Sequence, residues 1–347
     1  MSLIYRRSGL TLRLNADNDT DLVRALQRDL RALGYLRAGI DGGFGPGTER
    51  AVRALQIDLL RDHAPAAGQD GAPPVTIASF NIGPSGKRVT AATGVLDESL
   101  AACIDALLQH PDVPKLPESA EPRADNQRAL EVIRNAASMD APAPFIAAMV
   151  IQESGGQHFH VPGPLDTDTF ITVGLDRNDP GDPDRITSRG YGIGQYTLFH
   201  HPPRAAEVAA VMLDPSQNAS AAFRGLREKF AKFVVGPADA ADDRKKEHPL
   251  LPLRECRYAR TDSRFMRDCQ ACAASVRRIS IQAGTPVFAG AQLAYRVDQY
   301  YPTASYSGVP DRAEFLCDWP YAVRRYNGSG VDSYHYQTHV LLNLLRI

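Results

Sequence analysis

Hydrophobic residues recur at helical spacing near the start of the chain. Residues 19–36 read DTDLVRALQRDLRALGYL, and their large apolar side chains fall on one face of a helix. These positions are Val23, Leu26, Leu30 and Leu33. Gly34 follows directly and is a typical stop signal. The pattern therefore predicts an amphipathic first helix that ends at Gly34.

Two further helices are predicted in the same region. After a glycine-rich turn, residues 48–60 predict a second helix with Thr48 as its N-cap. A polar insertion runs from residue 63 to 90, and residues 94–108 then predict a third amphipathic helix. The first 107 residues are therefore predicted to form a small three-helix module, with the boundaries 1–107.

The rest of the chain shows a linker pattern and then a long helical pattern. Residues 108–125 contain four prolines and several charges, which favours a semi-rigid extended linker. Residues 126–347 contain few strictly alternating segments, so we predict a mainly α fold, with a helical second domain that has little or no sheet. The helices expected there cover residues 126–138, 143–154, 204–213, 217–233, 265–280, 288–299, 318–326 and 333–346.

Composition narrows the function classes. The 347-residue chain has 44% hydrophobic and 23% charged residues, as in ordinary soluble globular proteins. A net charge of −1 gives no general attraction to nucleic acid. No apolar stretch reaches the roughly 18 residues that a membrane span needs. The first 20 residues lack the pattern of a secretion signal, so we expect synthesis in the cytoplasm.

Cysteine usage leaves several readings open. Five cysteines are present, and four lie in the C-terminal half. One or two disulfides in an oxidising compartment are one reading, and buried thiols are the other. The C-x-x-C at 269–272 has no second pair at matching spacing and is a weak zinc signal. His158 and His160 lack a supporting metal motif, so we expect no metal and no cofactor.

A single glutamate follows a predicted apolar helix. Pro142 or Pro144 suits the first turn of this helix, Asp140 can cap it, and the glycine pair after Ser154 suits its end. Glu153 then lies in the last turn, where the helix dipole and apolar neighbours would raise a carboxyl pKa. A general acid needs a carboxyl that keeps its proton near neutral pH. A solvated helix end is the competing reading.

The N-terminal pattern resembles a known family. Residues 22–56 are similar to the peptidoglycan-binding domain type 1 family, and residues 94–107 are similar to its last helix. The motif residues that carry the resemblance are Leu26-Gln27, Leu33-Gly34-Tyr35, Asp41-Gly42, Phe44-Gly45, Thr48, Ala51-Val52 and Leu55-Gln56. The resemblance implies that this module binds peptidoglycan glycan strands. The long insertion between residues 63 and 90 departs from the family pattern.

Three ordered motifs carry a second resemblance. Three motifs, in this order, resemble the lysozyme-like superfamily of soluble lytic transglycosylases and goose-type lysozymes. They are Glu153-Ser-Gly-Gly, Gly-Tyr-Gly-Ile-Gly-Gln ending at Gln195, and Ala-x-x-x-Tyr-Asn-Gly around Tyr326. The resemblance implies that Glu153 is the catalytic acid. It also implies substrate-binding or pocket-supporting roles for Gly192, Ile193, Gly194, Gln195, Tyr196, Tyr326 and Asn327. Ile193-Gly194 departs from the family's leucine-methionine, and the 42 positions (195 − 153) between Glu153 and Gln195 are longer than usual.

The inserted segment between these motifs decides the expected reaction. Residues 164–188 look like an inserted loop or hairpin rich in aspartate. A hydrolase needs a second carboxylate to position water, whereas lytic cleavage uses the sugar's own 6-hydroxyl. The candidates are Asp166, Asp168, Asp176, Asp179, Asp182 and Asp184. Asp166 and Asp168 are favoured because they lie nearest in sequence to Glu153. A solvated acidic loop is the alternative.

We therefore expect a monomeric muramidase that cleaves the MurNAc-β-1,4-GlcNAc bond. A lytic transglycosylase, a non-catalytic wall-binding protein and a metal-dependent amidase are the alternatives. Its action would follow non-classical export to the periplasm or cell wall, as an effector of type VI secretion or as a phage-type endolysin. The effector reading implies an immunity protein as a partner. No nucleic acid and no membrane is expected as a partner.

Overall fold

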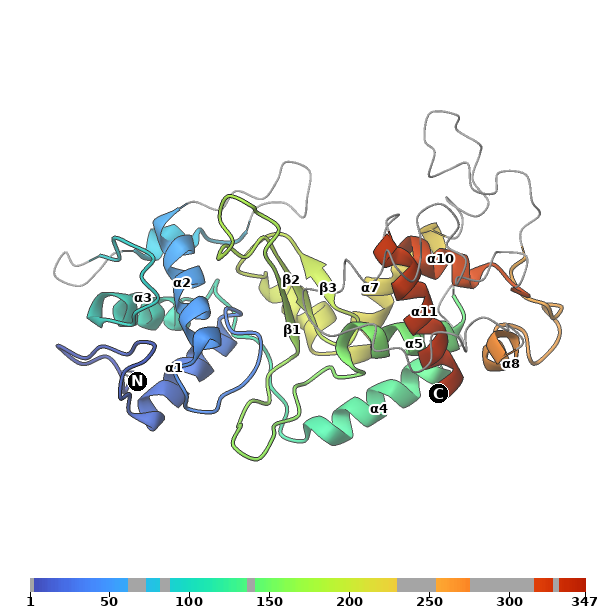
Figure 1. Ribbon diagram of the computed structural model, residues 1–347, viewed down its shortest axis with the longest axis horizontal. Helices are drawn as coiled ribbons and strands as arrows, with labels where there is room; N and C mark the ends of the chain where they lie inside the picture. Colours follow the sequence, from blue (N-terminus) through green and yellow to red (C-terminus); the bar gives the residue numbers. More distant parts are fainter. Residues whose placement is uncertain are drawn as a thin grey trace. The chain divides into compact units, whose positions relative to one another are not determined.

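The structure is a computed structural model (Figure 1). It describes residues 3–61, 73–81, 88–135, 141–229, 254–274, 315–326 and 331–347. The chain divides into two compact units. Unit 1 comprises residues 1–129 and 157–218, and unit 2 comprises residues 130–156 and 219–347. This division does not coincide with the predicted boundaries, because residues 157–218 group with the N-terminal residues in unit 1.

Unit 1 begins with the three expected helices, α1 (Thr20–Ala32), α2 (Pro46–Leu60) and α3 (Glu98–Gln109). Asp19 caps α1 by accepting hydrogen bonds from the backbone amides of residues 21 and 22. The N-cap of α2 is Gly45, so the prediction that Thr48 caps this helix is wrong. The Thr48 side chain is instead buried inside the first turn of α2, where it accepts a hydrogen bond from Gln27.

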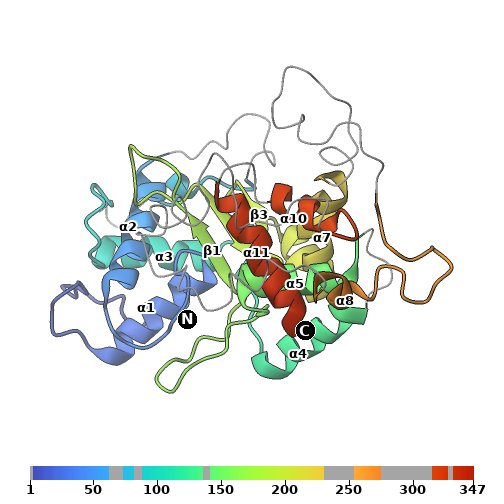
Figure 2. The same ribbon diagram turned by 45° about the vertical axis from the view of Figure 1, so that its right-hand side comes forward.

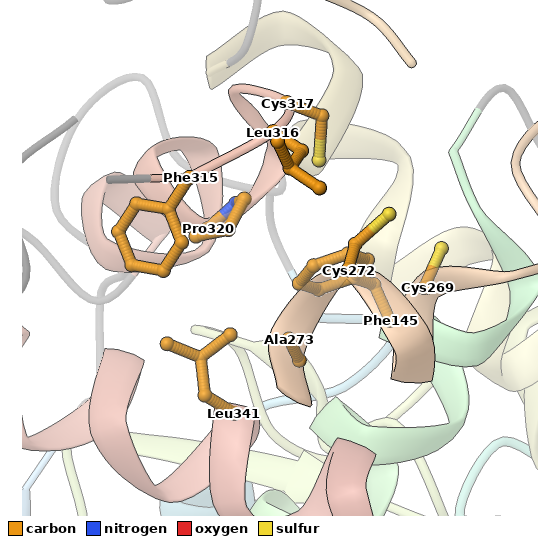
Figure 3. Close-up of a pocket in the computed structure, with 9 residues that line it drawn as sticks. All are labelled: Phe145, Cys269, Cys272, Ala273, Phe315, Leu316, Cys317, Pro320 and Leu341. Atoms are coloured by element: carbon orange, nitrogen blue, oxygen red, sulfur yellow. The ribbon is translucent and has the colours of Figure 1, made fainter. Parts of the chain in front are cut away.

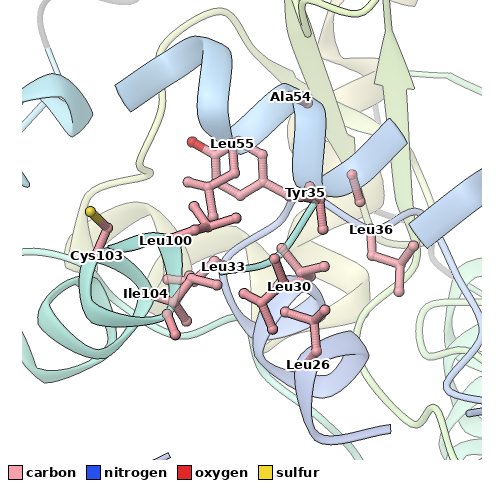
Figure 4. Packing of buried hydrophobic residues seen from close by; sticks show 14 of the residues in the cluster. Leu26, Leu30, Leu33, Tyr35, Leu36, Ala54, Leu55, Leu100, Cys103 and Ile104 are labelled. Atoms are coloured by element: carbon pink, nitrogen blue, oxygen red, sulfur yellow. The ribbon is translucent and has the colours of Figure 1, made fainter. Parts of the chain in front are cut away.

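The core of the module lies where these three helices meet (Figure 4). Leu26 and Leu30 of α1, Leu55 of α2, and Leu100 and Ile104 of α3 are all fully buried. Each such side chain stabilises the fold by about 1.5–3 kcal/mol through the hydrophobic effect. The helical spacing that the sequence displays is therefore the spacing of this core. A short 3-10 helix, Ile77–Phe80, adds Ile77 to it.

The segment predicted as a linker is part of unit 1. Val113 and Leu116 are buried, and the Leu116 amide donates to the carbonyl of Ala32 at 2.8 Å. The Ile171 amide likewise donates to the carbonyl of Pro117 at 2.8 Å. The two ends of this stretch are helical, and the buried apolar side chains between them attach the stretch to the module. It therefore does not act as a spacer.

Residues 157–218 add a small antiparallel sheet to unit 1. Its strands are β1 (Val173–Asp176), β2 (Ser188–Tyr191) and β3 (Tyr196–Leu198), in the order β1-β2-β3. The register pairs Val173 with Tyr191 and Tyr191 with Tyr196. The inserted segment thus forms a hairpin with β2. The sequence analysis expected either a loop or a hairpin here. The short helix α6 (Ala205–Glu207) continues into a π-helical turn, Val208–Met212.

Unit 2 is helical in its described parts. It contains α5 (Ala143–Ser154), α8 (Cys269–Ala274), α10 (Trp319–Tyr326) and α11 (Val331–Arg346). The boundary between the units falls within α4 (Pro122–Asn135) and α7 (Pro215–Lys229). Helix α11 packs against α5 and α10 (Figure 2). Residues 143–150 of α5 are almost entirely buried, which explains why this helix is apolar on all sides.

The mainly α prediction with little sheet is confirmed. Helix α5 has the predicted bounds, while α8 begins at Cys269, later than expected, because residues 259–268 form turns. The expected helix over 288–299 lies outside the described residues. Among the described helices, none combines the length and the apolar character that crossing a membrane requires.

Candidate functional site

Glu153 lies in the last turn of α5. Gly155 ends the helix in the left-handed conformation, with φ of +65°, and the amides of Gly155 and Gly156 donate to the carbonyls of Ile151 and Val150 respectively. Glycine is favoured here because a Cβ atom makes this conformation costly. Glu153 is half-buried, in contrast to the fully buried residues one and two turns earlier. The helix stop therefore fixes the carboxyl at the edge of the apolar interior of unit 2.

A tyrosine from α11 binds this carboxyl. The Tyr336 hydroxyl donates a hydrogen bond of 2.5 Å to Oε1 of Glu153. Tyr336 is 7% exposed. Burial raises the pKa of Tyr336 well above its usual value, and the charge of Glu153 and this hydrogen bond raise it further. Tyr336 therefore keeps its proton over the physiological pH range and always acts as the donor in this pair.

A second tyrosine completes an aromatic cluster beside Glu153. The Tyr326 ring stacks on the Tyr336 ring, with centroids 6.2 Å apart and planes at 30°. On its other side it meets Phe223, with centroids 5.4 Å apart. The Tyr326 hydroxyl donates to the carbonyl of Ala222 at 3.1 Å. Burial, followed by the charge of Glu153, raises the pKa of Tyr326. The structure thus brings two sequence-predicted residues, Glu153 and Tyr326, together in unit 2.

Tyr336 contacts the Glu153 carboxyl directly but is not part of the sequence motifs. It lies 183 positions after Glu153, and no local pattern links the two. Only the packing of α11 on α5 brings them together. Asn327, which the resemblance also implies for this pocket, lies outside the described residues.

The glycine motif forms the tight turn between β2 and β3 in unit 1. Gly192 has φ of +71°, and a Cβ atom there would lie 2.6 Å from the His158 ring. The amides of Gly192, Ile193 and Gly194 donate to Thr172 O, His158 Nδ1 and Asn218 Oδ1 respectively. All three backbone donors are therefore used inside the protein. Glycine is required at position 192 by packing as well as by conformation.

Gln195 and Tyr196 are the partly exposed residues of this motif. Gln195 has φ of +52°, and its Nε2 donates to the carbonyl of Gly192 at 2.7 Å. Its side chain lies over Gly174 and Gly190, where any Cβ atom would come within 3 Å of Oε1. The alternating glycines thus make room for this glutamine. The motif and Glu153 belong to different compact units, so a groove shared by the two stays a prediction.

The His158 ring binds the backbone of the glycine turn. The sequence did not indicate this role. The ring is fully buried, its Nε2 lies 2.9 Å from the carbonyl of Met212, and its Nδ1 accepts the Ile193 amide. Nε2 must therefore carry the proton of a neutral ring. Burial lowers the pKa of His158 from 6.5 to about 4, although the Met212 bond opposes this shift. His158 is a structural residue of the turn.

Asp168 does not have the geometry of a second catalytic carboxylate. It is fully buried and forms an ion pair with the equally buried Arg31 of α1, with 2.7 Å between Oδ2 and Nε. The Gly39 and Phe170 amides donate to its two oxygens at 3.0 Å each. The sequence-based assignment of Asp168 is therefore corrected. Its carboxylate binds the inserted segment to the N-terminal module and has no access to a substrate.

Asp166 has a similar structural role. Its Oδ1 accepts the amides of Ile40 at 2.7 Å and Asp168 at 2.9 Å, and its Oδ2 lies 2.8 Å from His160 Nε2. Burial alone would raise the pKa of Asp166, but the hydrogen bonds from Ile40, Asp168 and His160 lower it on balance. An ionised carboxylate with three hydrogen-bond donors is well suited to fixing a loop. The catalytic role expected of Asp166 stays a prediction.

The residues that carry the first resemblance hold the fold of the module together. Gln27 is buried, and its amide bonds to Asp41, Thr48 and the backbone of the glycine-rich turn. Gln56 is also buried and binds the amide of Gly94 and the carbonyl of Val95. These two glutamines of the motif therefore hold two loops in place. Within the described residues, no group of three or more His, Cys, Asp or Glu side chains is arranged to hold a metal ion.

Comparison with known protein families gives a match in the N-terminal module. Residues 19–58 match the family described as "Putative peptidoglycan binding domain". No curated protein and no solved structure matches the chain. The match covers α1, the glycine-rich turn and most of α2. It supports peptidoglycan as a partner and association of the protein with the cell wall.

Proposed function

We propose that the protein is a peptidoglycan glycosidase that uses Glu153 as its general acid. The observation that carries the proposal is the 2.5 Å hydrogen bond from Tyr336 to Glu153, within an aromatic cluster, in a chain that also has a peptidoglycan-binding domain. The wall-binding domain supports the substrate class. The carboxyl supports the chemistry, because glycosidic bond cleavage needs a positioned proton donor.

The role of each residue follows from the contacts around the carboxyl. Glu153 would give its proton to the glycosidic oxygen between MurNAc and GlcNAc as the bond from that oxygen to the anomeric carbon breaks. Tyr336 donates a hydrogen bond to Oε1 and so orients the carboxyl. The Tyr326 ring stacks on Tyr336, and the Phe223 ring in turn packs against Tyr326 at a tilted angle. Tyr336 is thus a positioning residue for this reaction.

The module of unit 1 would raise the local concentration of substrate. Binding through one part of a chain makes cleavage by another part effectively intramolecular. Mutations in the core of the module would therefore weaken digestion of intact wall more than digestion of short soluble glycan fragments.

Lytic cleavage is the second candidate reaction, and one observation favours it over hydrolysis. Asp166 and Asp168, the two expected partners of Glu153, are both engaged by residues of the N-terminal module. Other aspartates of the inserted segment are paired with arginines of unit 1, namely Asp179 with Arg185, Asp182 with Arg61, and Asp184 with Arg53. A reaction in which the sugar's 6-hydroxyl attacks needs no second carboxylate.

Mass spectrometry of the products tests both proposals. Purified sacculi are digested with wild-type protein, with Glu153→Gln and with Glu131→Gln, an exposed glutamate on α4 of the same unit. We expect wild type and Glu131→Gln to release muropeptides and Glu153→Gln to release at least about 100-fold less. Reducing ends identify hydrolysis, and 1,6-anhydro ends identify lytic cleavage. Release of free stem peptides, or no release by the wild type, would overturn the proposed activity.

A further inference from the structure

Four of the five cysteines come together in unit 2. Cys269 and Cys272 lie one turn apart on α8, and Cys317 lies two residues before α10. These three residues line one apolar pocket, together with side chains of α5 and α11. Figure 3 shows their sulfur atoms along one edge of this pocket. Segments that are 48 positions apart in sequence (317 − 269) therefore present thiols to the same place.

Cys256 is the fourth member of the group. Its sulfur accepts the backbone amide of Met266 at 3.4 Å, three residues before Cys269. Burial, then the neighbouring thiols of Cys317, Cys272 and Cys256, raise the pKa of Cys269. Both observations put Cys256 beside the start of α8. The fifth cysteine, Cys103, is buried in the core of unit 1 and provides an internal control.

We propose that Cys256, Cys269, Cys272 and Cys317 form two disulfide bonds in the mature protein, each joining one cysteine of α8 to one outside it. The regular helical geometry of α8 disfavours a bond between its own two cysteines. Cβ atoms three positions apart on a helix are about 5–6 Å apart, whereas a disulfide needs roughly 3.5–4.5 Å. Cys269 therefore pairs with Cys256 or Cys317, and Cys272 pairs with the other.

Each bond forms by thiol–disulfide exchange. Two cysteine thiols lose two hydrogens and become one disulfide, and the disulfide of an oxidising oxidoreductase, or glutathione disulfide, takes up the two electrons and two protons to become two thiols. Burial raises the pKa of Cys317 to about 12, although the Trp319 backbone opposes this. The thiolate is the reactive form. The bonds therefore form while the chain folds, and folding then protects them from reduction.

The bonds would brace the helices that hold Glu153. Helix α8 packs against both α5 and α11, which carry Glu153 and Tyr336. Two disulfides would attach α8 to the segment before it and to the start of α10. This consequence rests on the proposed function only in that peptidoglycan lies outside the cytoplasmic membrane, in compartments where disulfides persist. Unit 2 would then reach its full stability in the compartment where its substrate is found.

Counting thiols in the full-length protein tests the inference. The protein is matured in an oxidising compartment, denatured with EDTA present, and alkylated with iodoacetamide, with and without prior reduction. We expect one labelled cysteine, Cys103, without reduction and five with reduction. Cys103→Ser should lower both counts by one. Peptide mapping should find α8 linked to the peptides of Cys256 and Cys317.

Several outcomes would overturn the proposal. These are five labels without reduction, a bond that includes Cys103, a bond between Cys269 and Cys272, or stoichiometric zinc that must be removed before the four thiols react. Reduction should also lower the Tm of unit 2 by roughly 10 °C or more. An unchanged Tm would overturn the bracing role. The thiol count uses no substrate, so it stands or falls independently of Glu153 and of any digestion assay.

Discussion

Unit 1 and unit 2 both hold carboxylates away from bulk water, but they surround them differently. In unit 1, Asp168 pairs with Arg31 and accepts two backbone amides, so its charge is balanced within the fold. In unit 2, Glu153 is half-buried, accepts a hydrogen bond from the protonated phenol of Tyr336 and lies beside the stacked rings of Tyr326 and Tyr336. The first arrangement stabilises the fold of unit 1, and the second is the one that we propose for proton transfer. The surroundings of the two carboxyls differ in a way that their sequence motifs do not show.

The largest effect on stability is expected from removing the Asp168 carboxylate. Asp168→Ala would leave the fully buried Arg31 guanidinium without a counter-charge, which costs about 3–5 kcal/mol in the free energy of unfolding. Urea unfolding of the full-length protein measures this loss. Glu118→Ala is the control, because it removes an exposed pair with Arg28 that contributes about 0–1 kcal/mol. Equal losses in the two variants would contradict the structural role of Asp168.

His158 predicts a pH dependence that belongs to unit 1. Its pKa in the folded state, about 4, is below the usual 6.5, so the folded protein binds fewer protons than the unfolded chain. The stability that this provides is present above pH 6.5 and is lost as the pH falls from 6.5 to 4. The loss over that interval amounts to about 3 kcal/mol.

An NMR titration isolates this effect from other ionisable groups. The His158 ring should stay neutral, with the proton on Nε2, until the pH falls below about 5. Stability measured by urea unfolding should decrease over the same range. A titration midpoint near 6.5 would show that the ring is accessible to water and would refute its role under the glycine turn.

The smallest of the three effects is expected in unit 2. Tyr336→Phe removes the hydroxyl that orients Glu153 but keeps the stacked ring, so we expect roughly tenfold slower glycan cleavage. Wall binding should be unchanged. Tyr258→Phe is the control, because that hydroxyl donates to Asp268, elsewhere in the unit. Full activity of Tyr336→Phe would mean that the hydrogen bond does not position the acid.

The sequence predicted local structure well where local rules decide it. Helical spacing and the stop at Gly155 predicted α1 and α5, because burial of one face or of the whole helix follows from the side chains of that segment. The strands of the sheet were not located from the sequence. They are three or four residues long, which is too short to show a clear alternation of hydrophobic and polar residues. Thr48 was misassigned because its partner, Gln27, comes from another helix.

The candidate site was predictable only in part. The motifs identified Glu153 and Tyr326, whereas Tyr336 depends on the packing of two helices far apart in sequence. Asp168 was chosen for its sequence distance from Glu153, but Arg31, far earlier in the chain, determines its surroundings. Pairs of this kind depend on tertiary structure, and a single sequence carries no signal for them.

One paired assay tests the central claim that Glu153 performs the chemistry while unit 1 carries the affinity for the wall. Glu153→Gln and wild type are incubated with purified sacculi, and bound protein is measured by pelleting while released muropeptides are measured in the supernatant. The account predicts equal binding and at least about 100-fold less release by the variant. Release by Glu153→Gln at the wild-type rate would contradict it.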